Sequence, residues 1–528
     1  MRLLLPGILI VACTVRFWGL SDRGLYYYDE GRNYLEAKAA LALLTGRTGV
    51  AESIQIRDAR PAHNFTTAAL LAVHDSPNAV LYLSAAWGVV TVWLVALLAA
   101  RIWGPREALI AAAALAVSPY HAAYSRSGLV DSALAALAAA ALLALLRGRE
   151  AAGRGRAAAW VFAAGLAVGF ALGHSVRAIP VAVCAVIAAG VLGLFRPPLL
   201  AALALGALLP PAVCDLLQRH WASGLGTAAP GVFPSGPYAA QAWSITTGTA
   251  GFGFAPSALA ALPGYFLPVE GPVAVTWALA AAAVWLVRRH SRVESALHLF
   301  WWAPFAFYGL YSGTAHRFFL AAFPFLALAR ARVLGLGLDR LARGRDRAVV
   351  AGLLIAASLP WLARLRADSS PYLELLRRTG TPDLPHLTTN LPVGRALAGV
   401  TRCEVVPGNA EEAETLRRAG FRYLIVDLQP RFGGEAATEG RRRMVAAIER
   451  GRVPVLSVPW PPVTLELYVL NQHAAGARQR DALAGLGLSF PAVRLYDLGK
   501  AKWAMPPAAS ATKENTERKR PREKTGGA

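Results

Sequence analysis

The sequence predicts a mainly helical protein, with about eleven membrane-spanning helices in a bundle and a small α/β domain outside the membrane. The 528 residues are 55% hydrophobic and only 16% charged, and their mean hydropathy is +0.41. A soluble globule carries about a quarter charged residues, so this composition indicates a polytopic membrane protein. Long runs of Ala, Leu and Val fill the chain up to residue 364, and a different pattern follows.

The predicted spans are the runs of about 20 mostly apolar residues that a bilayer requires. The first run is interpreted as a retained span, because it lacks the small-x-small site of a cleaved signal peptide. The runs lie at residues 3–20, 79–100, 107–124, 129–146, 157–175, 178–195, 198–217, 271–287, 296–312, 316–334 and 348–364.

Arginines are distributed unevenly between the connections of these spans. Dense clusters, such as those at 147–156 and 330–347, fall on one side, and few arginines fall on the other. Basic loops remain in the cytoplasm, so the N-terminus is predicted inside and the C-terminal domain outside the inner (plasma) membrane. Two long outside loops are expected, at 21–78 and 218–270. The first contains a helical pattern at 31–46, typical of a headgroup-plane helix or an ordinary loop helix. The second is rich in aromatics, as in an interfacial belt or a lid.

From about residue 365 the pattern is that of a soluble domain. Strand-like alternation occurs at 421–428, 453–460, 464–470 and 493–498, and helical patterns occur at 411–419 and 441–450. Strands that alternate with helices predict an α/β domain over 365–505. Residues 1–364 are the predicted transmembrane domain. Residues 506–528 are highly charged without an apolar pattern, which predicts a disordered basic tail.

Several functional classes are disfavoured by the composition. The net charge is +22, but most arginines lie in short clusters between apolar runs, so we expect no nucleic-acid partner. The four cysteines and the histidines show no spacing typical of a disulfide framework or a zinc site. The sequence contains no P-loop, so nothing indicates nucleotide hydrolysis.

Asp29 and Glu30 form a carboxylate pair shortly after the first apolar run. At the mouth of a helix bundle, such a pair is placed to take a proton from a polar acceptor. Repulsion between adjacent carboxylates predicts a raised pKa for one of them, which suits a base near neutral pH. The alternative is a solvated pair whose charge is offset by Arg23 or Arg32. A divalent ion held by Asp29 or Glu30 is a further hypothesis that the sequence does not decide.

A second charged group lies in the predicted outside turn 118–131, which reads Ser-Pro-Tyr-His-Ala-Ala-Tyr-Ser-Arg-Ser-Gly-Leu-Val-Asp. Arg126 and Asp131 stand at the outer ends of two predicted spans. Charges this close to hydrocarbon are costly unless they are paired or functional. They either form an ion pair that orients the turn, or Asp131 joins the other carboxylates at this face.

Two further arginines are predicted at the same face. Arg60 precedes the second span, and Arg317 follows His316 at the start of a late span. A guanidinium binds phosphate oxygens through a planar fork, so Arg60, Arg126 and Arg317 suit a lipid phosphate. For each of them the alternative is that the side chain snorkels to the lipid headgroups.

Several motifs occur together in this chain. They are Arg16 with Leu20 before Asp29-Glu30, Arg60-Pro61, Trp103-Gly104, Ser118-Pro119-Tyr120-His121, Tyr124-Ser125-Arg126, Asp131, and His316-Arg317-Phe318. In this combination the sequence resembles the GT-C class of integral-membrane glycosyltransferases, especially the protein O-mannosyltransferases and the bacterial lipid A aminoarabinose transferases. The resemblance is best over residues 1–150, looser to 364 and only architectural beyond. Relatives often show Lys-Pro-Pro where this chain has Arg60-Pro61-Ala62.

The resemblance implies an enzyme of the cell envelope that takes sugars from polyprenyl phosphate and transfers them outside the cytoplasmic membrane. The acceptor would be a protein, lipid or glycan. Asp29 would be the base that deprotonates the acceptor hydroxyl, and the reaction would invert the anomeric carbon. Glu30 and Asp131 would orient groups or hold an ion. The departing phosphate would be stabilised by Arg60, Arg126, His316 and Arg317.

A transporter or flippase of lipid-linked glycans is the main alternative from another class. Such proteins place ionisable residues and broken helices near the bilayer midplane. The predicted span interiors are almost free of charge, although Pro180, Pro210 and Pro211 interrupt spans. A scaffolding protein would leave the acidic residues without a purpose, and the early Asp-Glu pair argues against a ligase of lipid-linked polysaccharide.

Overall fold

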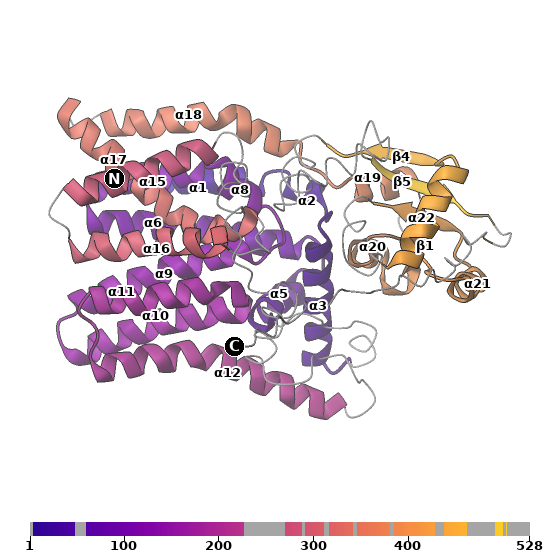
Figure 1. Cartoon of the computed structure of the whole chain (residues 1–528), viewed down its shortest axis with the longest axis horizontal. Helices are drawn as coiled ribbons and strands as arrows, with labels where there is room; N and C mark the ends of the chain where they lie inside the picture. Colours follow the sequence, from indigo (N-terminus) through magenta and orange to yellow (C-terminus); the bar gives the residue numbers. More distant parts are fainter. Residues whose placement is uncertain are drawn as a thin grey trace, which may run out of the picture.

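The computed structural model describes residues 4–47, 60–225, 270–287, 291–310, 316–341, 346–380, 385–427, 438–461, 492–499 and 503. Within this part of the chain, a bundle of long helices lies at one end and a small mixed sheet with its helices at the other (Figure 1). This arrangement confirms the predicted fold class of a mainly helical protein with an α/β unit. Most of the predicted aromatic loop (residues 226–269), the strand at 464–470 and the basic tail lie outside the described residues.

A helix coincides with each predicted span. Seven described helices are long and apolar enough to cross a membrane, or eight if one bent pair counts as a single span. The predicted number of crossings and their orientation therefore stay predictions. The bundle helices are α1 (Leu4–Phe17), α6 (Ala79–Ile102), α7 (Pro105–Ala116), α8 (Pro119–Ser125), α9 (Asp131–Glu150), α10 (Arg154–His174), α11 (Ile179–Val191), α12 (Pro197–Leu225), α15 (Gly271–Val287), α16 (Arg292–Leu310), α17 (Phe323–Leu341) and α18 (Asp346–Arg366).

The span predicted at 107–124 is broken into α7 and α8, which meet at an angle of 61°. Pro119 has no N–H to continue the hydrogen bonding of α7, so a new helix starts there instead. Ser118 caps this new helix by accepting a hydrogen bond from the backbone N–H of His121 at 3.1 Å. The predicted span is therefore a bent pair of helices, and the bend lies at the start of the predicted turn 118–131.

Glycines bring α10 and α12 into close contact. A Cβ added at Gly165 would lie 2.3 Å from the carbonyl oxygen of Leu203, and one added at Gly206 would lie 2.4 Å from that of Phe162. Gly165 and Gly169 have the four-residue spacing that small residues show where membrane helices pack closely. The backbones of the two helices therefore touch without intervening side chains.

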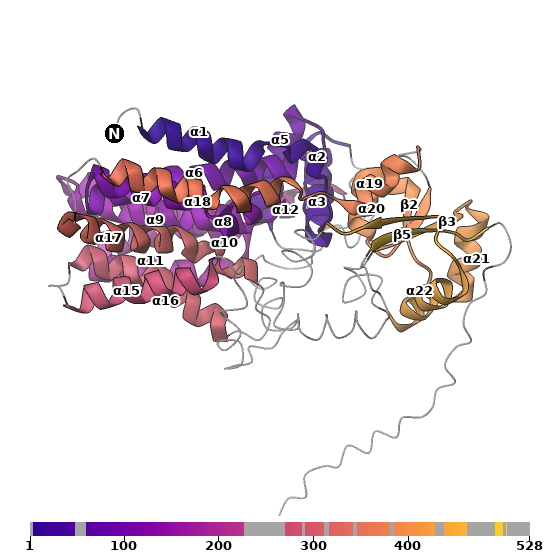
Figure 2. The ribbon, with the colours of Figure 1, turned by 90° about the horizontal axis from the view of Figure 1, so that it is seen from above.

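One helix, α3 (Tyr28–Leu44), lies across the end of the bundle and faces the α/β unit (Figures 1 and 2). It confirms the helix predicted at 31–46. Its side chains are largely buried, because it packs against α5 (Pro61–Val73) on one side and α20 (Leu391–Ala398) on another. The short α2 (Leu20–Arg23) leads into it from α1. The Asp-Glu pair is consequently fixed in the first turn of a packed helix.

The described part of the α/β unit is built on a five-stranded sheet with the order β2-β1-β3-β5-β4. β1 pairs in parallel with β2 and β3, and β5 is antiparallel to β3 and β4. The predicted strands near 421–428, 453–460 and 493–498 are confirmed as β3, β4 and β5, and the two predicted helices as α21 and α22. β1 and β2 have three residues each, too few for alternation to show. The elements are α19 (Pro371–Arg378), β1 (His386–Thr388), β2 (Cys403–Val405), α21 (Ala410–Arg418), β3 (Tyr423–Val426), α22 (Glu439–Gly451), β4 (Leu456–Pro459) and β5 (Ala492–Asp497).

Candidate active site

A chain of alternating charges lies where α3 meets the bundle. Asp29 Oδ2 is 2.7 Å from Nη2 of Arg317, and Nε of Arg317 is 3.9 Å from Oδ2 of Asp131. Oδ1 of Asp131 accepts a hydrogen bond from Nη1 of Arg177 at 2.9 Å. The structure thus brings Asp29 and Asp131 to the same guanidinium. We refer to Asp29, Asp131, Arg177 and Arg317 as the charged centre.

Each member of the charged centre comes from the end of a helix. Asp29 is in the first turn of α3, and Asp131 is the first residue of α9. Arg177 lies in the short η1 (Val176–Ala178), and Arg317 in η3 (His316–Ala322). The first turn of a helix favours carboxylates because of the helix dipole. Asp131 is 2% exposed, whereas Asp29 is 18% exposed, so Asp29 is the more accessible of the two carboxylates.

Arg60, the residue immediately before α5, lies beside the charged centre. Its Nη1 donates to Oδ1 of Asn33 at 3.0 Å, and Nδ2 of Asn33 donates to the carbonyl of Gly128 at 2.7 Å. Asn33 is fully buried, and its two hydrogen bonds join α3 to the residue before α5 and to the turn before α9. This network orients Arg60 near Asp29.

Three arginines determine the protonation of Asp29. Burial by itself raises the pKa of this carboxyl, but Arg317, Arg60 and Arg32 outweigh burial and hold the pKa below its ordinary value. The expectation of a raised pKa is therefore wrong for Asp29, because the nearby guanidinium groups stabilise the charged form. In this arrangement Asp29 is a carboxylate at neutral pH and only a weak base.

Arg317 retains hydrogen-bonding capacity. Its Nε and Nη1 have no hydrogen-bond partner within the described part of the chain, and neither has Oδ2 of Asp131. The guanidinium is 12% exposed and lies 5.6 Å from the centroid of the Tyr27 ring. A guanidinium with two nitrogens that make no hydrogen bond to the described residues is suited to bind an anion with oxygen acceptors.

Glu30 faces away from the charged centre, although it is next to Asp29. Its Oε2 accepts from the backbone N–H groups of Tyr26 and Tyr27, both at 3.1 Å. Its Oε1 accepts from Arg23 at 2.8 Å and from the backbone N–H of Gly128 at 2.9 Å. Glu30 has no exposed surface, and its four contacts join α3, α2 and the turn before α9. This environment suits a structural group.

Arg126 and His316 complete the set of predicted site residues. Nη1 of Arg126 donates to the carbonyls of Val15, Arg16 and Trp18 at 3.2, 3.4 and 2.9 Å. Arg126 thereby satisfies carbonyls at the end of α1 that have no partner within the helix. His316 begins η3 next to Arg317, and its side chain lies outside the description.

Arg177 is the member of the charged centre that sequence reasoning did not select. Its guanidinium packs 4.4 Å from the centroid of the Phe318 ring and pairs with Asp131. The available signal was its position, since few arginines fall in the predicted outside connections. Its role depends on Asp131, which no local pattern reveals.

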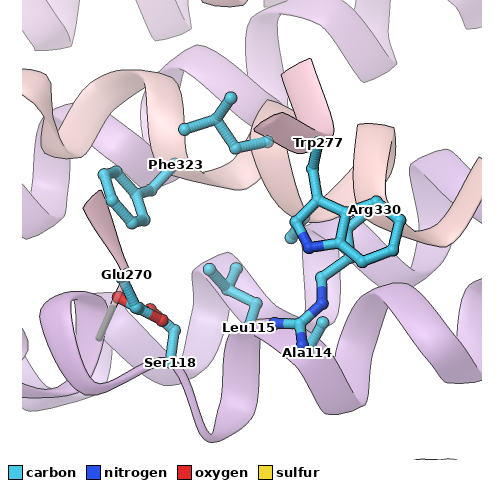
Figure 3. Close-up of a pocket in the computed structure, with 9 residues that line it drawn as sticks. Ala114, Leu115, Ser118, Glu270, Trp277, Phe323 and Arg330 are labelled. Atoms are coloured by element: carbon cyan, nitrogen blue, oxygen red, sulfur yellow. The ribbon is translucent and has the colours of Figure 1, made fainter. Parts of the chain in front are cut away.

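A pocket that contains another carboxyl, that of Glu270, lies between α7, α15 and α17 (Figure 3). Glu270 precedes α15 and accepts from Oγ of Ser118 at 3.0 Å and from the backbone N–H of Tyr120 at 2.9 Å. Arg330 and Trp277 lie across the pocket from it. Burial raises the pKa of Glu270 to about 7, despite the opposing effects of these hydrogen bonds and of Arg330. Sequence reasoning did not select Glu270.

The charged centre does not fit a divalent metal ion held by Asp29 and Glu30. Asp29 faces Arg317, whereas Glu30 faces Arg23 and backbone N–H groups, so the two carboxylates do not converge. The described residues include no group of three or more His, Cys, Asp or Glu side chains that could hold a metal ion. A divalent ion requires several converging oxygen ligands, and here guanidinium groups stand between the carboxylates.

Comparisons with known proteins support the resemblance. The family model described as dolichyl-phosphate-mannose-protein mannosyltransferase matches residues 58–213. No curated protein matches the chain.

Solved structures of membrane glycosyltransferases share the fold. ArnT from Cupriavidus metallidurans bound to undecaprenyl phosphate has a TM-score of 0.56 at 14% identity, and the match covers 85% of this chain and 95% of that one. The archaeal oligosaccharyltransferase AglB from Archaeoglobus fulgidus, in complex with an inhibitory peptide and a dolichol-phosphate, has a TM-score of 0.50 at 14% identity, covering 81% and 69%. The chain therefore shares the fold of ArnT and AglB, and its long apolar helices indicate a multi-pass membrane protein.

Proposed function

We propose that the protein transfers a sugar from a polyprenyl-phosphate-linked donor to an acceptor hydroxyl at the outer face of the cytoplasmic membrane. The observation that carries this proposal is the pairing of Asp29 with Arg317 in the charged centre. It places a carboxylate next to a guanidinium that has further hydrogen-bonding capacity. The likeness to ArnT, whose structure is described as bound to undecaprenyl phosphate, supports the class of donor.

The arginines are the proposed phosphate site. Arg317, Arg177 and Arg60 contribute positive charge around Asp29 and Asp131. Negative charge grows on the phosphate as the sugar leaves, and guanidinium groups fixed in advance stabilise that charge more than they stabilise the bound donor. His316 is adjacent in sequence to Arg317 and remains a proposed member of this site.

The donor phosphate would also activate the base. An anion bound to Arg317 competes with Asp29 for the same guanidinium and offsets the positive charge that lowers the pKa of Asp29. Asp29 would then become a stronger base only when the donor is present. This coupling reconciles a depressed pKa in the free protein with a role in general-base catalysis.

In the proposed reaction, the acceptor oxygen attacks the anomeric carbon while Asp29 takes the hydroxyl proton. The bond between the anomeric carbon and the phosphate oxygen breaks, and its electron pair leaves with the polyprenyl phosphate. Attack from the face opposite the phosphate inverts the configuration. Asp131 would position Arg317 and Arg177, Glu30 would position the first turn of α3, and Arg126 would hold the end of α1 in place.

The placement of the α/β unit supports the proposed location. The unit lies at the same end of the bundle as α3, which carries Asp29 (Figure 1). Together with the arginine distribution, this favours an extracytoplasmic α/β unit and charged centre in the inner membrane.

The test uses the full chain purified in detergent, undecaprenyl phosphate linked to a hexose or to an aminopentose, and membranes that supply acceptors. We expect release of undecaprenyl phosphate from one donor, and loss of this release in Asp29→Asn. Asp22→Asn, at an exposed position in α2, is the matched control. If the protein releases nothing but moves the intact donor across vesicle membranes, it is a flippase and the proposal fails.

A further inference from the structure

The α/β unit has a sheet edge of the kind at which open parallel sheets bind ligands. β1 lies between β2 and β3, and all three run parallel. After β1 the chain continues to β2, at one side of the sheet. After β3 it continues to β4, at the other side of the sheet. Ligands of open α/β sheets bind at such a divergence, beyond the carboxyl ends of the strands. The residues at this edge are therefore placed to bind a ligand.

Three buried polar residues occupy this edge. Oγ1 of Thr389 donates to the carbonyl of Asp427 at 3.1 Å and accepts from its N–H at 2.8 Å. Nδ2 of Asn390 donates to Oδ2 of Asp427 at 2.9 Å. All three are at most 3% exposed. The same Nδ2 lies 3.4 Å from the carbonyl oxygen of Tyr26, in the loop that precedes Asp29.

The rest of this loop is held by residues near the start of the α/β unit. Ser370 donates from Oγ to the carbonyl of Leu25 at 2.6 Å and from its N–H to the carbonyl of Arg23 at 2.7 Å. The hydroxyl of Tyr26 donates to Asp368 at 3.0 Å, and the Tyr26 ring meets that of Trp460 edge-on at 6.0 Å. The backbone and the side chain of the loop are thus both fixed from the α/β side.

Beyond Asp29, a second contact fixes α3 itself. A Cβ added at Gly31 would lie 2.5 Å from the carbonyl carbon of Pro392, at the start of α20. The backbones of α3 and α20 therefore touch. Asp29 lies between Tyr26 and Gly31, so contacts with the α/β unit precede and follow it in the chain.

We propose that the α/β unit is a positioning element for Asp29: its sheet edge binds the Tyr26–Tyr27 loop as an internal ligand, and Asn390 and Asp427 are the positioning residues. The catalytic consequence rests on the proposed function, but the docking of the loop does not. The unit would hold Asp29 against Arg317 and at a fixed distance from the donor. Loss of the contact between the unit and the loop would therefore lower turnover rather than donor binding.

An exchange of the two side chains separates docking from stability of the unit. Asn390→Asp alone places two carboxylates together and should weaken the edge. The double variant Asn390→Asp/Asp427→Asn restores a hydrogen bond between the two side chains, because the new amide at 427 can donate to the new carboxylate at 390. The carbonyl of Tyr26 then faces this carboxylate, which has no N–H to donate to it. Glu411→Gln, at an exposed position in α21, is the control.

Amide hydrogen exchange of the full chain in detergent gives the first measurement. In the double variant we expect exchange at residues 25–30 to rise about five- to tenfold, while β1 and β3 keep wild-type protection. Unchanged exchange at residues 25–30 would overturn the inference, and so would an increase confined to the sheet.

Kinetics with undecaprenyl-phosphate sugar give the second measurement. We expect kcat of the double variant to fall about five- to tenfold with an unchanged KM for the donor. Full recovery of kcat would show that the edge matters only for stability and would overturn the inference. If the wild type transfers no sugar while the exchange results hold, the proposed function fails and the docking inference stands.

Discussion

Nη2 of Arg317 lies 2.7 Å from Oδ2 of Asp29, although 288 residues of chain separate them. The same guanidinium approaches Asp131, so one arginine links the two carboxylates of the charged centre. It keeps Asp29 ionised, and two of its nitrogens make no hydrogen bond to the residues that the structure describes. The proposed mechanism depends on this shared use of Arg317 by the base and the donor phosphate.

Replacement of Arg317 should affect the donor more than the acceptor. We expect Arg317→Gln to lower kcat/KM for the donor by roughly 100- to 1,000-fold, the usual cost of losing one transition-state charge contact. Arg317→Lys should lose less, because a lysine keeps the charge but not the fork. Kinetics with each substrate varied separately provide the measurement. A larger effect on the KM of the acceptor would contradict the assignment.

Replacement of Asp29 should separate chemistry from binding. We expect Asp29→Asn to lower turnover by about 100- to 10,000-fold, the range for loss of a general base. Affinity for undecaprenyl phosphate should be kept or increased, because Arg317 is no longer shared with a carboxylate. Native mass spectrometry with graded lipid measures the affinity. Lost affinity together with lost turnover would indicate that Asp29 supports the phosphate site itself.

The pH dependence of stability should follow the lowered pKa of Asp29. A folded pKa below the unfolded value of about 3.9 gives stability that is present above that value and lost as the pH falls through the folded pKa. The wild type should therefore lose stability below about pH 4 on this account. In Arg317→Gln, burial is opposed by fewer cations, so the pKa of Asp29 should rise toward its unfolded value and the loss of stability in acid should become smaller. Thermal unfolding from pH 3 to 8 measures both; identical profiles would argue against the interaction.

Glu270 should have the opposite effect on the pH dependence of stability. Its pKa is raised to about 7, so the unfolded chain releases this proton at lower pH than the folded chain. The folded state should lose stability as the pH rises from about 4.5 through about 7. Glu270→Gln, which stays neutral, should match the wild type near pH 5 and exceed it in Tm near pH 8. A constant Tm difference between the two proteins across this range would show that Glu270 titrates normally.

The contact between α10 and α12 should tolerate no side chain at Gly165. An added methyl group must displace the backbone of α12, so we expect Gly165→Ala to destabilise the protein by about 1–3 kcal/mol. Gly352→Ala in α18 is the control, because no atom lies within 4 Å of its added Cβ. This control should gain up to about 1 kcal/mol from helix propensity. Thermal unfolding in detergent compares them, and equal shifts would contradict the close packing.

Some features were predictable from local sequence and others were not. The strands β3, β4 and β5 and helices α21 and α22 show their alternation or helical period in consecutive residues. The break before Pro119 was also visible in principle, because proline ends a helix, but the apolar run hid it. The partners of Arg177, Glu270 and Asn390 come from distant segments, so no local pattern identifies them.

The sequence by itself determined that this protein is a bundle of apolar helices with an α/β unit. Backbone groups in a bilayer must be satisfied within the same segment, so each long apolar run becomes a helix whatever its neighbours are. Only the tertiary structure decided which of the two adjacent carboxylates faces the charged centre. Successive residues of a helix are about 100° apart, so Asp29 and Glu30 face different neighbours. The packing of η3 against α9 and α16 brought Arg317 to Asp29, whereas α2 and the turn before α9 enclosed Glu30.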